Sequence, residues 1–589
     1  MAGVALERLL RLGAVIVLIG ACASVVATQN VPPAADVVLL DARVLTVDDA
    51  FRTAAAVAVR DGRFVAVGSN DEVRRHVGPA TRVIDGRGRT VVPGFIDSHV
   101  HALDVASAEA TQPFVNLRSI EELQEWVRTE AKRRTSGSWI WTPRVFPTRL
   151  RERRFPTRQE LDAAAPDHPV VVDFAYAFSL NSAAIGAAGI TRESANPAGG
   201  AIVKDRAGEP TGLLRNAAGL LARFRPVSDG IPLETLERVH RQYLAAGITS
   251  VIERGATPRG LELYRALKKA GRLHVRATVT IRVPEPADAG AVDRFIDSLP
   301  FGFGEGDDWL KAGPLKLVAD GGILSGTAFM RTPFGPGGRE LYGIADPRDR
   351  GSLTLTKEQI AAAIGVIHRR GWQMVAHVTG DAGVDVVLDG IEAAQKQAPG
   401  PSNNGRRHTV IHGYFVNPDA AARAARLGVL VDTQPAWHYK DGDALAAALG
   451  ADRLAHFIGL NTWRRAGVTV AINTDHMFGL DANDAMNPFN PLLTIYSATT
   501  RRTESGRVLG AGEVVTRQEA LRMMTSAAAR FSFDEKHRGS IEIGKLGDFV
   551  VLDDHFLTVP SDRLRTMRVD LTVIGGRIAF DRSASKEFP

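Results

Sequence analysis

The central part of the chain repeats one pattern, in which a short apolar run rich in β-branched residues is followed by a segment with helical spacing. Helical patterns fill most of the intervals, for example at 261–270, 357–370 and 418–427. The apolar runs lie at residues 95–98, 248–252, 275–281, 315–318, 373–376, 409–411, 429–432 and 468–472. Eight strands that alternate with helices predict an α/β fold built as a (β/α)8 TIM barrel.

The interval between the first two predicted strands is far longer than the others. Residues 103–244 therefore form a large insertion after strand one, and they contain a strand-like run of their own at 170–174. Because the active sites of TIM barrels lie at the carboxyl ends of the strands, we interpret this insertion as a lid or side domain over the mouth of the barrel.

Both ends of the chain alternate short β-rich runs with turns. Asp61-Gly62 and Gly575-Gly576 each separate two such runs, which predicts two hairpins. Neither end has enough strands for a core of its own. We therefore expect one composite β-sandwich, made from residues 36–92 and 536–589, around a barrel domain at 93–535. A capping box at 516–519 predicts that a helix begins there and continues to 529.

Residues 1–27 have the pattern of an export signal peptide. Arg8 and Arg11 precede an uncharged apolar stretch that is short for a membrane span. Cys22 ends a sequence similar to a lipoprotein signal, whereas cleavage after Ala27 would release a secreted or periplasmic protein. We expect an exported protein that is either a membrane-anchored lipoprotein or simply cleaved; an uncleaved anchor is the third alternative.

The amino-acid composition excludes several classes of protein and of metal site. Of the 589 residues, 45% are hydrophobic, which excludes a disordered chain, and Cys22 is the one cysteine. A disulfide framework, a cysteine-ligated zinc and a protein-bound iron–sulfur cluster are thereby excluded. The 72 basic and 66 acidic residues leave a net charge of +6. We interpret the basic stretch at 144–158 as a solvated surface and expect no nucleic-acid partner.

Polar residues interrupt the apolar pattern where the predicted barrel strands end. Strand one ends in His99-Val100-His101, strand five at His377, strand six at His412 and strand eight at Asp475, while strand four contains Lys316. A single histidine at a strand end is more often a hydrogen-bonded core residue than a ligand. Two imidazoles on one face of a strand, two more on later strands and a carboxylate together predict a metal centre, in which Asp475 can also transfer protons.

Several motifs resemble those of a known family. Residues 92–101 resemble the opening motif of the amidohydrolase superfamily, and residues 539–553 resemble its return to the C-terminal sandwich. Residues 316–321 and 377–381, His412 and Gln434-Pro435 resemble the family 3 branch, which includes N-substituted formamide deformylase-like enzymes. The resemblance extends from about residue 36 to residue 580.

The resemblance implies a centre with one or two divalent ions, usually zinc. His99, His101 and Asp475 would hold one ion, and His377 and His412 would hold the other.

The resemblance also implies a role for Lys316, which matches the position of a carboxylated lysine that bridges the two ions in binuclear members. A lysine in a barrel interior beside cations is pushed toward the neutral amine that reacts with CO2. The alternative is an unmodified Lys316 that pairs with Asp320.

The sequence departs from the family pattern around the expected ligands. Residues 322–328 lack the arginine that usually follows the Asp-Gly of strand four. Strand six ends in Ile411-His412 instead of Glu-His, and strand eight ends in Asn473-Thr474-Asp475, followed by His476, instead of Gly-Ser-Asp. Because the ligands are retained, these changes indicate a shifted substrate.

We therefore expect a metal-dependent hydrolase of a small molecule, which cleaves an amide, an N-formyl group or a cyclic amide by metal-activated hydroxide. Asp475 would act as the general base, and Asp97 and Asp381 would orient the imidazoles. The alternatives are a deaminase, a lactone or phosphoester hydrolase, and an exported binding lipoprotein without turnover.

The substrate pocket is expected at the barrel rim. Trp437, His438 and Tyr439 follow strand seven and are predicted to line it together with Asp320, residues 325–330 and the insertion. The alternative is an ordinary loop with a buried tryptophan.

Overall fold

The computed structural model describes residues 32–226, 230–285, 287–398 and 404–585. Eight parallel strands form its central sheet, in the order β8-β14-β15-β16-β17-β18-β19-β20. Their bounds are β8 Phe95–Val100, β14 Ile248–Ala256, β15 Arg276–Arg282, β16 Leu310–Val318, β17 Met374–Val378, β18 Thr409–His412, β19 Leu430–Thr433 and β20 Val470–Ile472. A parallel bridge between Val100 and His476 brings the last strand's continuation back to the first. Each predicted strand corresponds to one of these eight, so the TIM-barrel prediction is confirmed.

Helices surround this barrel because each connection between parallel strands must cross over one face. Helix α10 shows the local cause: its capping box is formed by Thr356 and Gln359, and its apolar face is buried against the strands. The helices of the crossovers are α6 Leu233–Ala245, α7 Pro258–Lys269, α8 Ala289–Asp297, α10 Lys357–Arg369, α11 Asp381–Gln397, α12 Pro418–Arg426 and α14 Leu460–Arg465.

Two further sheets pack face to face, one made from the N-terminal part of the chain and the other from both ends. One contains β1 Val37–Leu40, β4 Ala56–Arg60, β5 Arg63–Gly68 and β6 Arg82–Asp85. The other combines the N-terminal β2 Arg43–Leu45, β3 Thr53–Ala54 and β7 Thr90–Pro93 with the C-terminal β21 Phe549–Leu552, β22 Val569–Ile574 and β23 Arg577–Asp581. One apolar cluster, which includes Leu39, Val59, Phe549 and Val573, fills the space between them. Both predicted hairpins are present, as β4–β5 and β22–β23.

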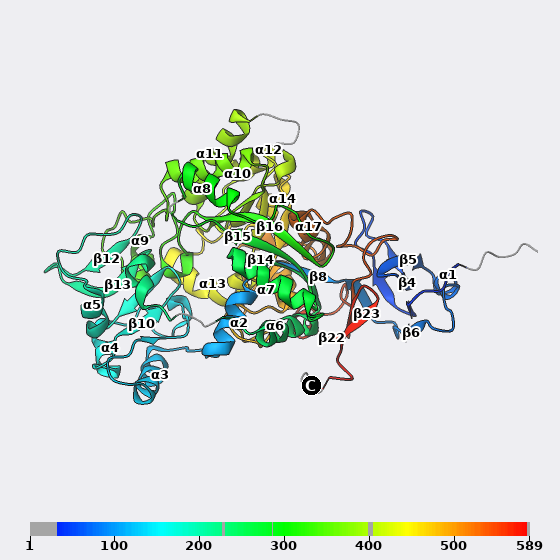
Figure 1. Cartoon of the computed structure of the whole chain (residues 1–589), viewed down its shortest axis with the longest axis horizontal. Helices are drawn as coiled ribbons and strands as arrows, with labels where there is room; N and C mark the ends of the chain where they lie inside the picture. The colour runs from blue at the N-terminus through cyan, green and yellow to red at the C-terminus, as the bar shows by residue number, and fades with distance from the viewer. Residues whose placement is uncertain (1–31, 227–229, 286, 399–403, 586–589) are drawn as a thin grey trace, which may run out of the picture.

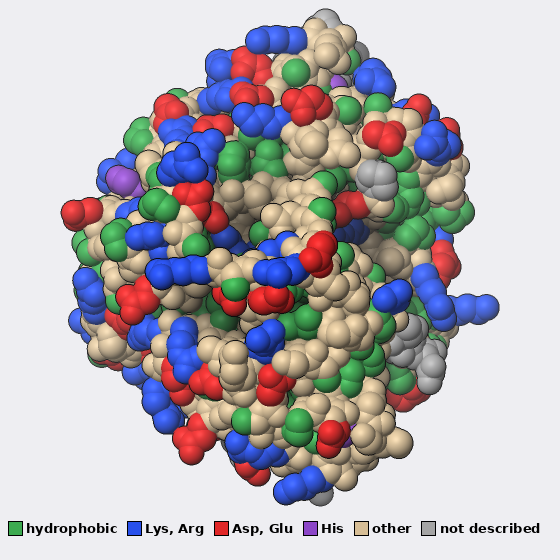
Figure 2. Space-filling view, turned by 90° about the vertical axis from the view of Figure 1, so that its left-hand side faces the viewer, with side chains coloured by type: hydrophobic (Ala, Val, Ile, Leu, Met, Phe, Trp, Pro, Cys, Tyr) green, Lys and Arg blue, Asp and Glu red, His purple; other side chains and the backbone are tan. Residues whose placement is uncertain are grey.

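The insertion carries a sheet of its own and lies at the opposite end of the molecule from the sandwich (Figure 1). Its strands are β9 Ile140–Trp141, β10 Val170–Asp173, β11 Ala177–Leu180, β12 Ala201–Lys204 and β13 Pro210–Arg215, and its helices include α2 Ala102–Thr111, α3 Ile120–Arg133, α4 Arg158–Ala164 and α5 Ser182–Ala188. Figure 2, which faces this end of the molecule, shows Lys and Arg side chains interspersed with Asp and Glu.

Two segments differ from the expectations. The chain after β19 forms helix α13, Pro435–Leu449, and not a loop; the proline stands in the first turn, where its missing N–H costs nothing. The helix that begins at the predicted capping box ends at Met523 (α16, Arg517–Met523), because Thr525 leaves the helical region before α17, Ser526–Ala529, begins.

The expected signal peptide at 1–27, with Cys22, lies outside the described residues. Within the described ranges, no helix combines the length and the apolar character needed to cross a membrane.

Candidate metal centre

Three side chains converge where the first and last barrel strands end. The Nε2 atoms of His99 and His101 lie 3.2 Å apart, and Asp475 Oδ1 lies 3.3 Å from the former and 3.4 Å from the latter. In the part of the chain that the structure describes, this is the group of His, Cys, Asp and Glu residues whose donor atoms are close enough to share one ion.

The backbone around these residues is fixed by hydrogen bonds and one strained residue. Asp97 accepts hydrogen bonds from His99 N at 3.3 Å and from Thr474 N and Oγ1 at 3.2 and 2.5 Å, so it ties the first strand to the end of the last one. Asp475 has a φ of +50°, which is unfavourable for a residue with a side chain. Asn487 Nδ2 donates to Asp475 O at 2.6 Å and supports this conformation.

The protonation states of these three side chains favour the binding of a cation. Burial, followed by the charge of Lys316, lowers the pKa of His101 to about 3, so its imidazole is neutral near pH 7. Burial raises the pKa of Asp475 to about 6, and its Oδ1 is buried without a hydrogen-bond donor. A carboxylate oxygen that faces two neutral imidazole nitrogens is what a divalent cation requires, so the donor set fits a metal ion.

His377 and His412 form a second pair nearby. His377 Nδ1 and His412 Nε2 face each other at 2.8 Å, and the rings of His99 and His412 lie 5.3 Å apart. The other nitrogens are held by the protein: His412 Nδ1 lies 2.8 Å from Gln434 Oε1, and His377 Nε2 lies 3.2 Å from Gly321 O. These contacts fix both ring orientations, as the partners of metal-binding histidines do.

Lys316 lies inside the barrel, and its nearest acceptor is Arg254 O at 3.4 Å. Burial lowers the pKa of its ammonium group to about 8. The ion pair with Asp320 that was the alternative does not occur between these described residues. Asp320 instead accepts three backbone N–H groups, from Phe329, Thr379 and Gly380, and so positions the loops after β16 and β17.

The residues predicted at the rim separate into two groups. Trp437 lies at the centre, with its ring 6.2 Å from that of His412. His438 is fully buried and faces Leu509 O at 3.1 Å, and Tyr439 Oη accepts from Arg565 at 3.3 Å, so neither side chain is directed at the metal ligands. The helical turn of α13 causes this separation, because consecutive residues of a helix point in different directions.

The prediction for Asp381 is wrong. Its carboxylate accepts from Arg331 N at 2.7 Å and from Asn417 Nδ2 at 3.2 Å, and it contacts no imidazole of the centre. The carboxylate beside His101 is Asp104, whose Oδ2 lies 3.5 Å from Nδ1. Asp97 likewise accepts from two backbone N–H groups and the Thr474 hydroxyl, whereas the expectation was that it would orient a ring.

The insertion contributes residues that the sequence did not predict. Tyr176, in the turn between β10 and β11, places its hydroxyl 3.4 Å from His377 Nδ1, and Ala175 beside it has a φ of +67°. Ser325 Oγ donates to Phe174 O at 2.5 Å and fastens this turn to the chain after β16. Arg144, also from the insertion, lies 3.8 Å from Met477 Sδ, two residues after Asp475.

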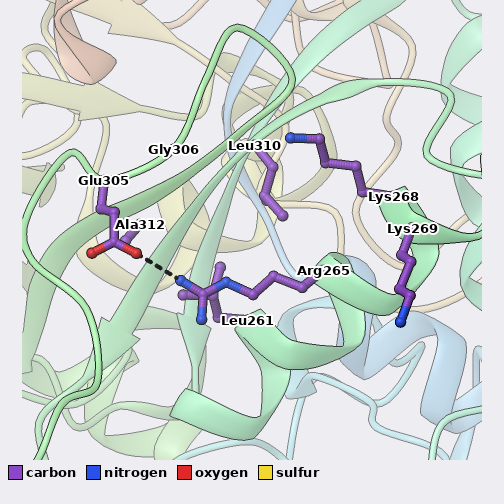
Figure 3. Close-up of a pocket in the computed structure, with 8 residues that line it drawn as sticks. All are labelled: Leu261, Arg265, Lys268, Lys269, Glu305, Gly306, Leu310 and Ala312. Carbon is purple, nitrogen blue, oxygen red and sulfur yellow. Dashed lines mark hydrogen bonds and ion pairs between the residues drawn. The ribbon is translucent and has the colours of Figure 1, made fainter.

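A cavity of about 410 Å3 opens at the amino end of β16, away from the carboxyl ends that carry the ligands (Figure 3). Arg265, Lys268 and Lys269 line it, and Arg265 pairs with Glu305 at 3.2 Å. None of the predicted site residues lines it.

Comparisons with known proteins show the family and the fold. Residues 82–580 match the model of a family described as "Amidohydrolase family". The chain is 28% identical to N-substituted formamide deformylase of Arthrobacter pascens, over 93% of this chain and 99% of the relative, and 27% identical to putative amidohydrolase YtcJ of Bacillus subtilis (strain 168), over 90% and 96%. An uncharacterized metal-dependent hydrolase from Pyrococcus horikoshii OT3 shares the fold, with a TM-score of 0.65 and 21% identity over 89% of this chain and 99% of that one. The chain belongs to the amidohydrolase family.

Proposed function

We propose that this hydrolase cleaves a carbon–nitrogen bond other than a peptide bond, in an amide, an N-formyl compound or a cyclic amide. The observation that carries the proposal is the convergence of His99, His101 and Asp475, with an unsatisfied carboxylate oxygen, at the carboxyl ends of the barrel strands. The name of the relative from Arthrobacter pascens, N-substituted formamide deformylase, supports the formamide member of this class.

Zinc is an ion that two imidazoles and a carboxylate commonly hold, and His377 and His412 would hold a second one. When bound, such an ion lowers the pKa of a coordinated water and polarises a carbonyl group. Burial keeps the imidazoles of His99 and His101 neutral, so their lone pairs are free for ligation. Asp475 accepts the proton of the attacking water and returns it to the leaving nitrogen.

Lys316 would carry the carbamate that bridges two ions. Support comes from its place on β16 inside the barrel and from the lack of an ion pair in the described structure. Gly255 lies beside it: a Cβ at that residue would be in van der Waals contact with Lys316 Nζ at 3.9 Å and with His101 Cε1 at 3.6 Å. Mass spectrometry of the intact protein in bicarbonate would detect the added CO2, and Lys316→Arg is the matched variant that cannot form it.

The test of the proposed function is metal analysis followed by assays on a panel of N-formyl and N-acyl compounds and cyclic amides. We expect amine release that a chelator abolishes and added zinc restores. Release of ammonia from amino-heterocycles, or of alcohol from lactones or phosphoesters, would favour the other hydrolase reactions. Full zinc occupancy without turnover of any compound would contradict an enzyme and favour a binding protein.

The role of Asp475 has its own test, in Asp475→Asn. The amide keeps the shape of the side chain and an oxygen ligand but cannot take a proton, so we expect zinc to remain while kcat falls by about 10³ or more. Plasma emission spectroscopy measures the zinc, and amine release measures kcat. Activity close to that of the unchanged protein would contradict the general-base role.

A further inference from the structure

A cleft of about 730 Å3 lies between the insertion and the barrel. This volume is typical of a small-molecule site. Part of its wall is apolar, with Phe114, Leu117, Phe146 and Met486 among its residues. Six basic residues line the rest together with three acidic ones: Arg118, Arg144, Arg149, Arg151, Arg153 and Lys440 against Glu122, Asp443 and Glu504.

None of the metal ligands lines this cleft, but Phe146, which does, has its ring 6.3 Å from that of Trp437, whose ring lies 6.2 Å from that of His412. The guanidinium group of Arg144 lies 5.1 Å from the centre of the Phe478 ring, three residues after Asp475. Met486 lines the cleft, and the next residue, Asn487, donates to Asp475 O. A substrate in the cleft would have to extend past Arg144 and Phe146 to bring its reacting group to the ligands, while its other end remained among the arginines.

Two arginines of the wall pair with carboxylates that do not line the cleft. Arg144 pairs with Asp173 at 3.1 Å, and Arg149 pairs with Asp441 at 2.8 Å. Both aspartates are buried, and neither lines the cleft, whereas both arginines do. Arg225 also approaches Asp173, at 3.8 Å, so one carboxylate is shared by two guanidinium groups. For these two arginines the compensating carboxylates lie behind the wall, whereas Glu122, Asp443 and Glu504 line the cleft itself.

Two further arginines in the cleft wall have free side chains. Arg151 and Arg153 are exposed, and within the described residues neither side chain has a hydrogen bond or an ion pair. The other basic groups of the outer wall are paired, Arg118 with Asp484 at 3.1 Å and Lys440 with Glu504 at 2.8 Å. The interpretation of residues 144–158 as a solvated surface is therefore wrong for Arg144, whose side chain is 13% exposed, and holds for these two.

We infer that the substrate has an apolar body and, remote from the bond that is cleaved, an anionic group such as a carboxylate, which the arginines of this cleft hold. The inference rests on the proposed function of the metal centre. A planar guanidinium group binds a carboxylate through two parallel hydrogen bonds, which gives both affinity and orientation. The apolar part of the wall would bind the apolar body of the substrate, because burial of apolar surface contributes affinity without fixing a direction.

A matched pair of formamides tests this inference: 4-(formamidomethyl)benzoate and 4-(formamidomethyl)benzamide differ in charge and hardly in shape. For the zinc-loaded full chain we measure kcat/KM for both and the Kd of both by calorimetry. We expect the carboxylate to be preferred by about tenfold at low ionic strength, and this preference to shrink as salt is added.

Variants identify the groups responsible. In Arg151→Gln/Arg153→Gln the preference for the carboxylate should fall below about threefold through a higher KM, while the kcat of the benzamide stays unchanged. Arg206→Gln is the control, because Arg206 is an exposed arginine of the insertion that does not line the cleft. A full preference in the double variant would overturn the assignment to these arginines.

The outcomes separate this inference from the proposed function. Equal handling of both probes, a preference for the benzamide or no binding of either would overturn the inference, whether or not turnover occurs. Hydrolysis of both at equal rates leaves the proposed function intact and removes only the anionic group. Tighter binding of the benzoate without hydrolysis of either probe supports the inference and contradicts formamide hydrolysis.

Discussion

The two histidine groups of the metal centre are built from the same residue types but are satisfied differently. In the first, His99, His101 and Asp475 direct their donor atoms at one another, and Asp475 Oδ1 and His99 Nδ1 are buried without hydrogen-bond partners. In the second, His377 and His412 share one hydrogen bond, and their remaining nitrogens have acceptors in the protein.

This difference has an energetic meaning. A buried polar atom without a partner costs about 1–3 kcal/mol, and for Asp475 Oδ1, which faces the two Nε2 atoms, this cost is recovered when a cation binds. The first group therefore gains more from a cation than the second, whose protein hydrogen bond must be given up first. We expect the first group to hold its ion more tightly.

The largest effect is expected for His101→Ala, which tests the first group. Removal of one of three converging ligands should release the ion of the first group and lower kcat/KM by about 10³ or more. Zinc content by plasma emission and amine release with a formamide are the two measurements. His555→Ala, at an exposed histidine, is the control and should change neither. Retention of zinc and activity would contradict the assignment of the first group.

His412→Asn tests the second group, with a smaller expected effect. The substitution removes an imidazole that Gln434 orients, so one ion should remain bound while kcat/KM falls by about 10²-fold. Titration with a chelating dye measures how tightly each ion is held. If His412→Asn loses metal more completely than His101→Ala, the order of the two groups is reversed.

A still smaller effect is expected for Tyr176→Phe, which removes the hydroxyl that lies 3.4 Å from His377 and keeps the ring. The loss of one hydrogen-bond donor at the second group should lower kcat by about tenfold. Zinc content and Tm should not change. A loss of zinc would show that the insertion supports the ligands themselves.

The smallest effect concerns the support behind the first group. Glu253 accepts hydrogen bonds from Leu103 N and Tyr264 Oη, both at 3.1 Å, and burial raises its pKa to about 8. Because the folded pKa exceeds the unfolded one, this residue stabilises the fold least above pH 8 and fully below about pH 4.5. In Glu253→Gln, we expect the Tm relative to the unchanged protein to rise by a few degrees between pH 5 and pH 8 in thermal denaturation. A constant difference across this range would contradict a protonated Glu253.

Much of the barrel could be predicted because each strand has a recognisable pattern within a few consecutive residues. Buried parallel strands are continuous apolar runs, and a polar residue at a strand end, such as His377 or His412, is visible as an interruption. The alternation of side chains along a strand likewise predicts that His99 and His101 share a face. The carboxyl ends of the strands lie within two residues of the predicted ones, except in β14, which extends to Ala256, four residues beyond the predicted end. Strand β16 begins at Leu310, five residues before the predicted start.

The remainder of the centre depends on contacts between distant segments. From the insertion, Tyr176 reaches His377 and Arg144 reaches Met477, two residues after Asp475, and no periodic pattern gives the orientation of that domain on the barrel. Asp104 lies three residues after His101, and its spacing on the first turn of α2 was the one available signal. Trp437 was predicted at the rim, but the helix that separates it from Tyr439 was not.

The bridge between Val100 and His476 has a thermodynamic consequence. The other neighbouring strands of the described barrel are joined by ladders of paired residues, whereas β8 and β20 meet at this bridge. This junction of β8 and β20 is the seam of the barrel. An ion shared by His99, His101 and Asp475 would therefore join the two sides of the seam without a covalent bond. Ligand binding to the folded state contributes about 2.7 kcal/mol when the free ion exceeds its Kd a hundredfold. Chelation should thus loosen the whole barrel along this seam, as well as stopping the reaction.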